Sequence, residues 1–190
     1  MKKVLNITIL LMLFALTASS QSIYKIDRQH SSVNFKVKHF SISFVNGRFE
    51  QFDGGIIGSI DDPQSARVFF NIKTNSIYTG VEQRDNHLIS DEFFDTKRFP
   101  IMSFESNSIE KIDDENYKLT GKLQIKDVTK DATFNVQYGG TAENKNGEQV
   151  VGFVAKSTIN RFDYKVAGDP DGLAIAKDVE IILYLEFKKS

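Results

Sequence analysis

The chain has no cysteine and no tryptophan, and after its first twenty residues it has no long hydrophobic run. Without cysteine it can form no disulfide bond, bind no metal through thiolates and carry no lipid on a thiol, so its stability must come from a hydrophobic core. Without a later apolar run of about twenty residues, no later segment is expected to span a bilayer. With 190 residues and no linker rich in proline or glycine, the chain is expected to form one domain.

The first segment has the composition of an export signal. Lys2 and Lys3 precede an apolar run from Val4 to Leu16, and small residues follow at 18–20. This run is shorter than the roughly twenty residues of a membrane-spanning helix. We expect residues 1–20 to be a cleaved signal peptide, with a retained anchor as the alternative, and residues 21–190 to form a periplasmic or secreted domain.

The charges give no sign of a strongly charged partner. Leaving out Lys2 and Lys3 lowers 24 basic residues to 22 against 25 acidic residues, a formal charge of about −3. A domain with this balance is not drawn as a whole to nucleic acid or to an anionic membrane. We therefore expect no nucleic-acid partner and no stable insertion into a membrane.

Hydrophobic and polar residues alternate along most of the remaining chain, as in strands with one buried face. This pattern predicts eight strands, at 31–39, 45–52, 67–74, 101–106, 117–125, 133–138, 150–159 and 178–187. Short polar clusters at 113–116 and 144–147 separate neighbouring strands as hairpin turns do. We expect an all-β fold, an eight-stranded antiparallel barrel in preference to a sandwich because closure removes exposed edges, with a short helical insertion between strands 3 and 4.

The interior of such a barrel can be filled by side chains or can hold one small ligand. The sequence has sixteen phenylalanines and no tryptophan, so most of its aromatic surface carries no polar group. On composition alone, a phenylalanine-rich core and an apolar ligand tunnel both remain open.

The insertion contains the stretch RDNHLISDEFFD, which begins at Arg84 and is dense in chemically capable side chains. If 81–91 is a helix, Arg84 and Asp85 fall between two apolar anchors, Val81 and Leu88, on one face. A charged pair in this position is expected to fix the helix against the sheet.

The rest of the insertion suggests a cover for the barrel. His87 and Asp91 are four residues apart and are expected to bond each other if the helix forms. Phe93 and Phe94 follow immediately and could lay apolar side chains across one barrel opening. We therefore expect a lid and not an active site.

Catalysis is the alternative reading. His30, His39 and His87, the only histidines, could form a zinc-type site with Asp85 in a metal-dependent or lipid-modifying enzyme. Their spacing does not favour this, because no H-x-x-x-H or H-E-x-x-H pair is present and no G-x-S-x-G motif marks a serine nucleophile. We expect no catalytic residue, no cofactor and no metal.

Several motifs occur in an order that resembles the YceI-like family of exported bacterial proteins. They are YKIDRQHS, VNFKVKH, the insertion motif above, FPIMSFES, LTGKLQIKDVTK and INRFDY, and the resemblance extends over 24–187. The resemblance implies an extended, lipocalin-like eight-stranded barrel that binds polyisoprenoid or similar long-chain lipid in an apolar tunnel. Lys165 departs from the family, which usually has glycine there, and this puts the local turn in doubt.

The resemblance favours the tunnel over the filled core, and the expected partner is a long-chain isoprenoid or fatty lipid. A tunnel needs an apolar lining because an unpaired polar atom inside it costs about 1–3 kcal/mol. The residues expected to contact the lipid are Phe35, Val37, Phe49, Phe70, Ile72, Leu88, Phe93, Phe94, Met102, Phe104, Leu119, Leu123, Phe134, Val136, Phe153, Ile159 and Leu183. A homodimer and a module that binds another protein remain open.

Overall fold

The computed structural model describes residues 22–168 and 171–190, and the expected signal peptide lies outside this part of the chain. The strands are β1 (Ile23–Ile26), β2 (Ser32–His39), β3 (Ser43–Phe49), β4 (Phe52–Ile57), β5 (Arg67–Lys73), β6 (Ile77–Tyr78), β7 (Ile101–Lys111), β8 (Asn116–Ile125), β9 (Val128–Glu143), β10 (Gln149–Asn160) and β11 (Ile175–Lys189). The helices are α1 (Glu82–Leu88) and the short 3-10 helices η1 (Pro63–Ser65), η2 (Thr74–Ser76) and η3 (Arg161–Tyr164).

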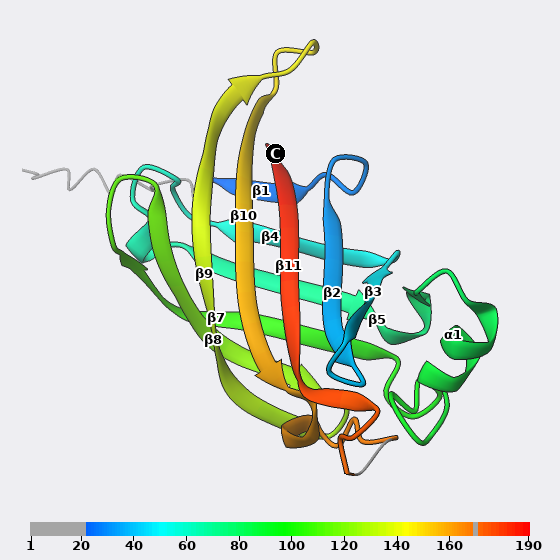
Figure 1. Ribbon diagram of the computed structural model, residues 1–190. Helices are drawn as coiled ribbons and strands as arrows, with labels where there is room; N and C mark the ends of the chain where they lie inside the picture. The colour runs from blue at the N-terminus through cyan, green and yellow to red at the C-terminus, as the bar shows by residue number, and fades with distance from the viewer. Residues whose placement is uncertain (1–21, 169–170) are drawn as a thin grey trace, which may run out of the picture.

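Eight of these strands close into an antiparallel barrel (Figure 1). The order around the ring is β1, β4, β5, β7, β8, β9, β10 and β11, and β1 closes it by pairing with both β4 and β11. The additional strands β2, β3 and β6 extend from β11. The expected all-β barrel is confirmed, and α1 lies between β5 and β7, which correspond to the third and fourth strands of the prediction.

Two strands, β1 and β2, pair with different parts of the same edge of β11. The barrel is open at the end where β2 takes the place of β1. β1 pairs with Phe187 to Lys189, whereas β2 pairs with the earlier part of β11, from Ile175 to Tyr184. At the end of the barrel where β2 lies next to β11, β2 pairs on its other side with β3 and not with β4. The insertion with α1 lies beside β3 and β5 there (Figure 1).

Alternate side chains face the interior as predicted, but they are not all packed. Val151 and Phe187 are almost fully buried. Ile181 and Leu183 on β11 face the same interior and are only half-buried. A side chain that points into a barrel and still has accessible surface borders a hollow, because close packing would have removed that surface. The interior is therefore packed in one part and hollow in another.

The predicted single strand at 45–52 is wrong, because the chain forms two strands there. Phe49 ends β3 and Phe52 begins β4, and both side chains are buried. Residues three apart cannot share a face of one continuous strand, because successive side chains alternate. The break is held by the N–H of Glu50, which donates to the Ser76 carbonyl at 3.0 Å. The closing strand β1 was not among the predicted strands.

Two further sequence expectations can be compared with the structure. The turn at Lys165 forms with lysine in the left-handed conformation, φ 57°, and the Lys165 ammonium lies 2.7 Å from the Asp127 carboxylate. The doubt about this turn is thus removed. Within residues 22–168 and 171–190, no helix combines the length and apolar character needed to cross a membrane.

Candidate functional site

The barrel encloses an apolar cavity of about 280 Å³ at the end where β2, β3 and the insertion meet. Its walls come mainly from β2, β5, β7, β8 and β11, and side chains of the insertion and of η3 border it at the open end. The strongly polar side chains among its lining residues are Asn34, His39, Arg84, His87, Ser103 and Arg161. A concave apolar space with a few polar groups is the usual form of a small-molecule site.

A second cavity, of about 300 Å³, adjoins the first inside the barrel. Val68, Leu119, Ala155 and Leu185 border both cavities, so the two spaces meet at these side chains. The second cavity also has polar residues at its border, namely Ser59, Asp61 and Lys111. Both cavities are lined by side chains that face the interior of the barrel, and they lie next to each other inside it.

Every residue predicted to line a tunnel borders one of these cavities. The first cavity is bordered by Phe35, Val37, Phe49, Phe70, Ile72, Leu88, Phe93, Phe94, Met102, Phe104, Leu119, Leu123, Phe134, Ile159 and Leu183. The second is bordered by Val136 and Phe153, and also by Leu119. Contact of these residues with a ligand remains a prediction.

Glycines on neighbouring strands give the large rings room along the barrel wall. Gly47 on β3 is paired with Phe35 on β2, and a Cβ at Gly47 would overlap the Phe35 ring. In the same way, a Cβ at Gly54 would overlap the ring of Phe70 on the paired strand. Because these rings lie over glycines, they occupy the wall and leave the space at the barrel centre free.

The insertion is held at its beginning by Thr79. The Thr79 N–H and hydroxyl both donate to Oδ1 of Asp85, at 2.9 and 2.5 Å. Arg84 donates from Nε to the Thr79 hydroxyl at 2.7 Å and from Nη2 to the Thr79 carbonyl at 3.0 Å. Arg84 and Asp85 thus hold the segment through a shared threonine. Val81 is 46% exposed, so its predicted role as an apolar anchor is wrong.

The end of the insertion covers the first cavity. Phe93 is buried and borders the cavity, and Phe94 packs edge to face on Phe49 with ring centroids 5.8 Å apart. His87 bonds Glu92 with Nε2 and Oε2 2.6 Å apart, so the expected bond to Asp91 is wrong. The tight turn after α1, which ends at Leu88, brings Glu92 and not Asp91 to the imidazole.

A lysine outside the insertion fixes it to two other turns. Lys126 donates from Nζ to the Phe93 carbonyl at 2.8 Å and to the Lys165 carbonyl at 3.0 Å. Gly168 also donates its N–H to the Glu92 carbonyl at 2.9 Å. These contacts join the insertion, the β8–β9 turn and the segment after η3 into one cover over the cavity.

The alternative metal-site residues are not brought together. His39 and His87 border the first cavity, Asp85 is bonded to Thr79, and His30 lies in the bend between β1 and β2. In the part of the chain that the structure describes, the one group of three or more histidine and acidic side chains spaced to share a cation is Asp27, His30 and Glu186.

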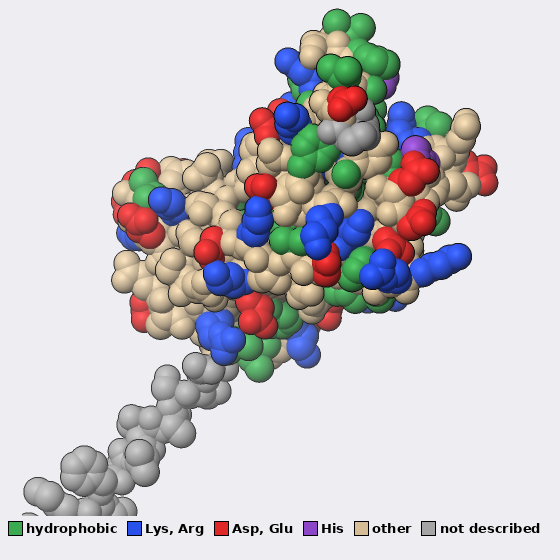
Figure 2. All heavy atoms as spheres, turned by 90° about the horizontal axis from the view of Figure 1, so that it is seen from below, with side chains coloured by type: hydrophobic (Ala, Val, Ile, Leu, Met, Phe, Trp, Pro, Cys, Tyr) green, Lys and Arg blue, Asp and Glu red, His purple; other side chains and the backbone are tan. Residues whose placement is uncertain are grey.

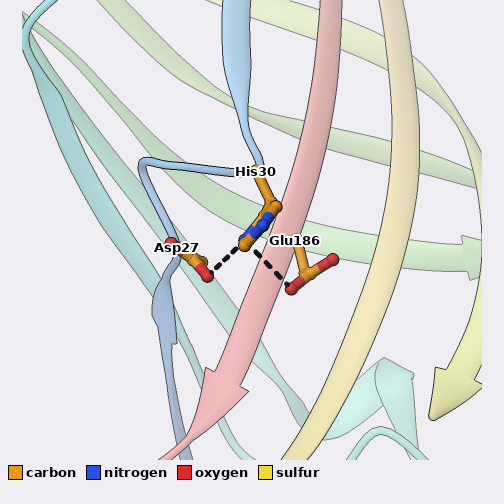
Figure 3. A group of neighbouring side chains, drawn as sticks. All are labelled: Asp27, His30 and Glu186. Atoms are coloured by element: carbon orange, nitrogen blue, oxygen red, sulfur yellow. Dashed lines mark hydrogen bonds and ion pairs between the residues drawn. The ribbon is translucent and has the colours of Figure 1, made fainter. Parts of the chain in front are cut away.

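That group is a structural tie between strands (Figure 3). His30 points from the bend towards Asp27, with Nδ1 2.8 Å from Oδ2, and towards Glu186 on β11, with Nδ1 3.7 Å from Oε1. The Lys188 ammonium lies 2.7 Å from the same Asp27 oxygen, where it already supplies a positive charge. Hydrogen bonds from Lys188 and then His30 lower the pKa of Asp27 to about 2, and the bond to Asp27 raises the pKa of His30.

Sequence reasoning missed Gly47, Thr79, Lys126 and Ala155. Gly47 lies in a strand pattern, and an isolated glycine there signals a close approach of another group. No comparable local signal marks Thr79, Lys126 or Ala155, because each gains its role from segments distant in sequence.

With the site described, comparisons with known proteins can be added. The YceI-like domain matches residues 24–187. A relative from Staphylococcus aureus (strain N315), UPF0312 protein SA2479, is 38% identical over 172 residues, which cover 88% of this chain and 98% of the relative. The crystal structure of the Campylobacter jejuni YCEI protein is 34% identical, with a TM-score of 0.72, over 80% of this chain and 90% of that chain.

A more distant structure has the same fold. It is a polyisoprenoid binding domain from Saccharophagus degradans, 17% identical, with a TM-score of 0.61 over 88% of this chain and 98% of that chain. At this identity the likeness concerns the fold alone. The domain match over most of the chain and the close relatives show the family directly: the chain belongs to the YceI-like family.

Proposed function

We propose that this chain is an exported lipid-binding protein that holds a long-chain isoprenoid or similar amphiphilic lipid in its barrel. The observation that carries the proposal is the apolar cavity of about 280 Å³ inside the barrel, whose walls are largely hydrophobic side chains. The adjoining cavity of about 300 Å³ offers space for a longer chain. The polyisoprenoid binding domain of similar fold supports the choice of ligand class.

The hydrophobic effect is large enough for this function. Burying a tail of about twenty carbons at about 0.8 kcal/mol per methylene gives roughly 16 kcal/mol. Association costs about 4–15 kcal/mol, so micromolar or tighter binding needs no strong head-group contact. The predicted lining residues are proposed to make these contacts, and selectivity for the head group is expected to be loose.

We propose binding without catalysis. Three of the polar side chains at the first cavity have structural partners: Arg84 bonds Thr79, His87 bonds Glu92, and Arg161 donates to the carbonyls of Val166 and Ile175. Groups committed in this way are poorly placed to activate a nucleophile. The alternative, a metal-dependent or lipid-modifying enzyme, would be favoured by stoichiometric metal whose removal abolishes a reaction on bound lipid.

Export to the periplasm or out of the cell is part of the proposal. Its support is the pair Lys2 and Lys3 followed by the short apolar run and small residues. N-terminal sequencing of the exported protein would locate the cleavage expected after residue 20. A protein that keeps the first segment would instead be anchored by it.

The proposed function is tested by native mass spectrometry of protein purified without detergent, followed by lipid extraction. We expect one long apolar molecule per chain, released on denaturation and identified in the extract as an isoprenoid or fatty lipid. The same spectra report the oligomeric state. Protein that is free of lipid, and that also fails to take up isoprenoid or fatty chains added in vitro, would contradict the proposal.

A further inference from the structure

The barrel end that carries the first cavity also carries an exposed hydrophobic projection. We call it the apolar tip, and it consists of Phe40, Ile42, Phe44 and Leu173, from the β2–β3 hairpin and the segment before β11. Ile42 exposes 88% of its surface, Leu173 76% and Phe40 57%. Figure 2, which views this end, shows hydrophobic side chains gathered on the part that protrudes at the top, with lysine and arginine side chains beside them.

The backbone holds this tip away from the barrel. The Ile42 N–H donates to the His39 carbonyl at 3.1 Å and closes the turn, and the Phe40 N–H donates to the Ala174 carbonyl at 2.8 Å. Phe40 and Ser41 both have positive φ, 46° and 60°. The turn comprises residues 40–42, because His39 pairs with Ser43, and glycine or asparagine is the usual choice where φ is positive. The chain instead places a large aromatic residue where its ring meets solvent, which folding of the hairpin does not require.

The tip stands at the edge of the first cavity. His39, Val45 and Ile175 border that cavity. His39 precedes Phe40, Val45 follows Phe44, and Ile175 lies two residues after Leu173. Any chain that enters or leaves the cavity at this end therefore passes close to the apolar tip.

Lysines accompany the tip on its outer side. The Lys36 and Lys38 ammonium groups lie 4.6 and 5.9 Å from the centroid of the Phe44 ring. Such side chains can lay their stems along apolar surface and direct the ammonium group to phosphates. Lys36 also pairs with Glu180 at 2.9 Å, so the attraction to anionic lipid is expected to be moderate.

We propose that the apolar tip docks on the surface of a phospholipid bilayer that contains anionic lipid, and so places the cavity opening against the membrane. Phe40, Ile42 and Leu173 enter the interface, while Lys36 and Lys38 remain at the level of the head groups. The proposal rests on the proposed function, because an opening directed at a membrane is useful only if the cavity takes its ligand there. It depends on the local arrangement of side chains and not on the net negative charge of the domain.

Vesicle flotation tests this proposal. The chain from residue 21, which contains every described strand, is mixed with vesicles of phosphatidylcholine containing about one-third phosphatidylglycerol, and bound protein is measured after centrifugation. We expect wild type to float with the vesicles. The double variant Phe40→Ser/Ile42→Ser should bind at least about tenfold more weakly, because two large apolar side chains are no longer transferred from water into the membrane interface. Ile112→Ser is the matched control, because Ile112 is 58% exposed in the β7–β8 turn and should not affect flotation.

Three outcomes would overturn the docking proposal: wild type that does not float, a double variant that floats like wild type, or a wild-type dimer in solution that the double variant loses. The last would make the tip a contact between copies of the chain. Native mass spectrometry of the double variant separates this proposal from the proposed function. Bound lipid without flotation of the wild type refutes docking alone, whereas absence of lipid binding in every variant refutes the proposed function.

Discussion

At the scale of single residues, the free space inside the barrel depends on glycines beneath aromatic rings. The clearest case is Gly47, because the nearest atoms that a Cβ there would meet belong to the side chains of Phe35 and Thr79. The ring of Phe35 can move, and the direction left open to it is the first cavity, which it borders. The fold can therefore survive a methyl group at this position while the cavity becomes smaller.

We predict that Gly47→Ala weakens binding of a long fatty chain more than it lowers stability. The expected loss of affinity is about tenfold, equivalent to about 1.4 kcal/mol, with a smaller change in the free energy of unfolding. Gly152→Ala is the control, because a Cβ there meets nothing within 4 Å. Fluorescent fatty-acid titration and urea unfolding measure the two effects. Equal affinity of Gly47→Ala and wild type would contradict this account of the cavity.

The second prediction at this scale concerns pH and His30. The pKa of His30 is raised above its ordinary 6.5 by the bond to Asp27, so the bond stabilises the fold fully below pH 6.5 and is lost as pH rises through the higher folded value. His30→Gln should therefore lower the melting temperature at pH 6 and have little effect at pH 9. The effect is expected to be small, because His30 is exposed. Melting temperatures across this pH range provide the measurement.

Asp27 supplies the internal check for that experiment. Its pKa is lowered from 3.8 to about 2, so its contribution is present above pH 3.8 and is lost only as pH falls through about 2. The Lys188–Asp27 pair thus persists from pH 6 to 9. A difference between wild type and His30→Gln that does not change over this range would show that the imidazole acts by packing and not by charge.

At the scale of elements, the insertion covers the first cavity, and hydrogen bonds to Thr79 fix its position. Asp85→Ala leaves the Thr79 N–H without its carboxylate acceptor, while the hydrogen bond from Arg84 to the Thr79 carbonyl is retained. A half-buried donor that loses its partner costs about 1 kcal/mol, at the low end of the range for buried groups. We predict lower stability and faster release of bound lipid, measured by urea unfolding and by stopped-flow displacement of a fluorescent fatty acid.

Asp85→Asn is the matched control for the cover. Its side-chain oxygen can still accept from Thr79, so both effects should be smaller than for Asp85→Ala. If Asp85→Ala released lipid at the wild-type rate, the insertion would not control access to the cavity. A lipid-modifying reaction abolished by His87→Gln, with affinity and melting temperature unchanged, would make the insertion an active site.

The phenylalanines that border the two cavities differ in how deeply they are buried. Phe104 borders the first cavity but is buried and packs edge to face on Phe134, with ring centroids 5.2 Å apart, whereas Phe153 borders the second cavity and is only half-buried. We predict that Phe104→Ala costs about 3–5 kcal/mol of unfolding free energy. Phe153→Ala should cost less, on the order of 1–2 kcal/mol, and should mainly weaken lipid binding. Chemical unfolding with lipid titration separates the two, and similar stability losses would show that Phe153 is also core.

At the scale of the whole molecule, the junction of the two cavities sets the length of chain that fits. Ala155 is buried on β10 and borders both cavities. We predict that Ala155→Phe fills the junction at an overpacking cost of about 1–3 kcal/mol. Chains of about eighteen carbons or more should then bind at least tenfold more weakly, because excluding two or three methylenes removes about 2 kcal/mol.

Chains of about eight carbons are the control for Ala155→Phe, because one cavity should accommodate them. Their affinity should stay near that of wild type. A series of fatty acids of increasing length, titrated into both proteins, gives the measurement. A uniform loss of affinity at every length would indicate general distortion of the barrel and would contradict a continuous path through both cavities.

The sequence by itself predicted most of the strands, the closed barrel and the residues that face its interior. These features follow from alternation along one strand, which is local: Val33, Phe35 and Val37 share a face whatever the rest of the chain does. The same local rule would have divided the expected strand at 45–52, because Phe49 and Phe52 have odd spacing. Family resemblance supplied the preference for a tunnel, which composition left open.

Only the tertiary structure decided where the interior is hollow, what holds the cover and which apolar side chains stay in solvent. Buried and half-buried positions follow the same alternation: Phe104 and Phe153 both face the interior, yet Phe104 is buried and Phe153 keeps accessible surface. Lys126 reaches the Phe93 carbonyl only after the β8–β9 turn meets the insertion. Ile42 is exposed because its hairpin extends past the barrel end. The hollow positions, the contacts of the cover and the exposed side chains all depend on how strands distant in sequence pair and close the barrel. That pairing is set by the free energy of the whole folded chain and not by any local pattern.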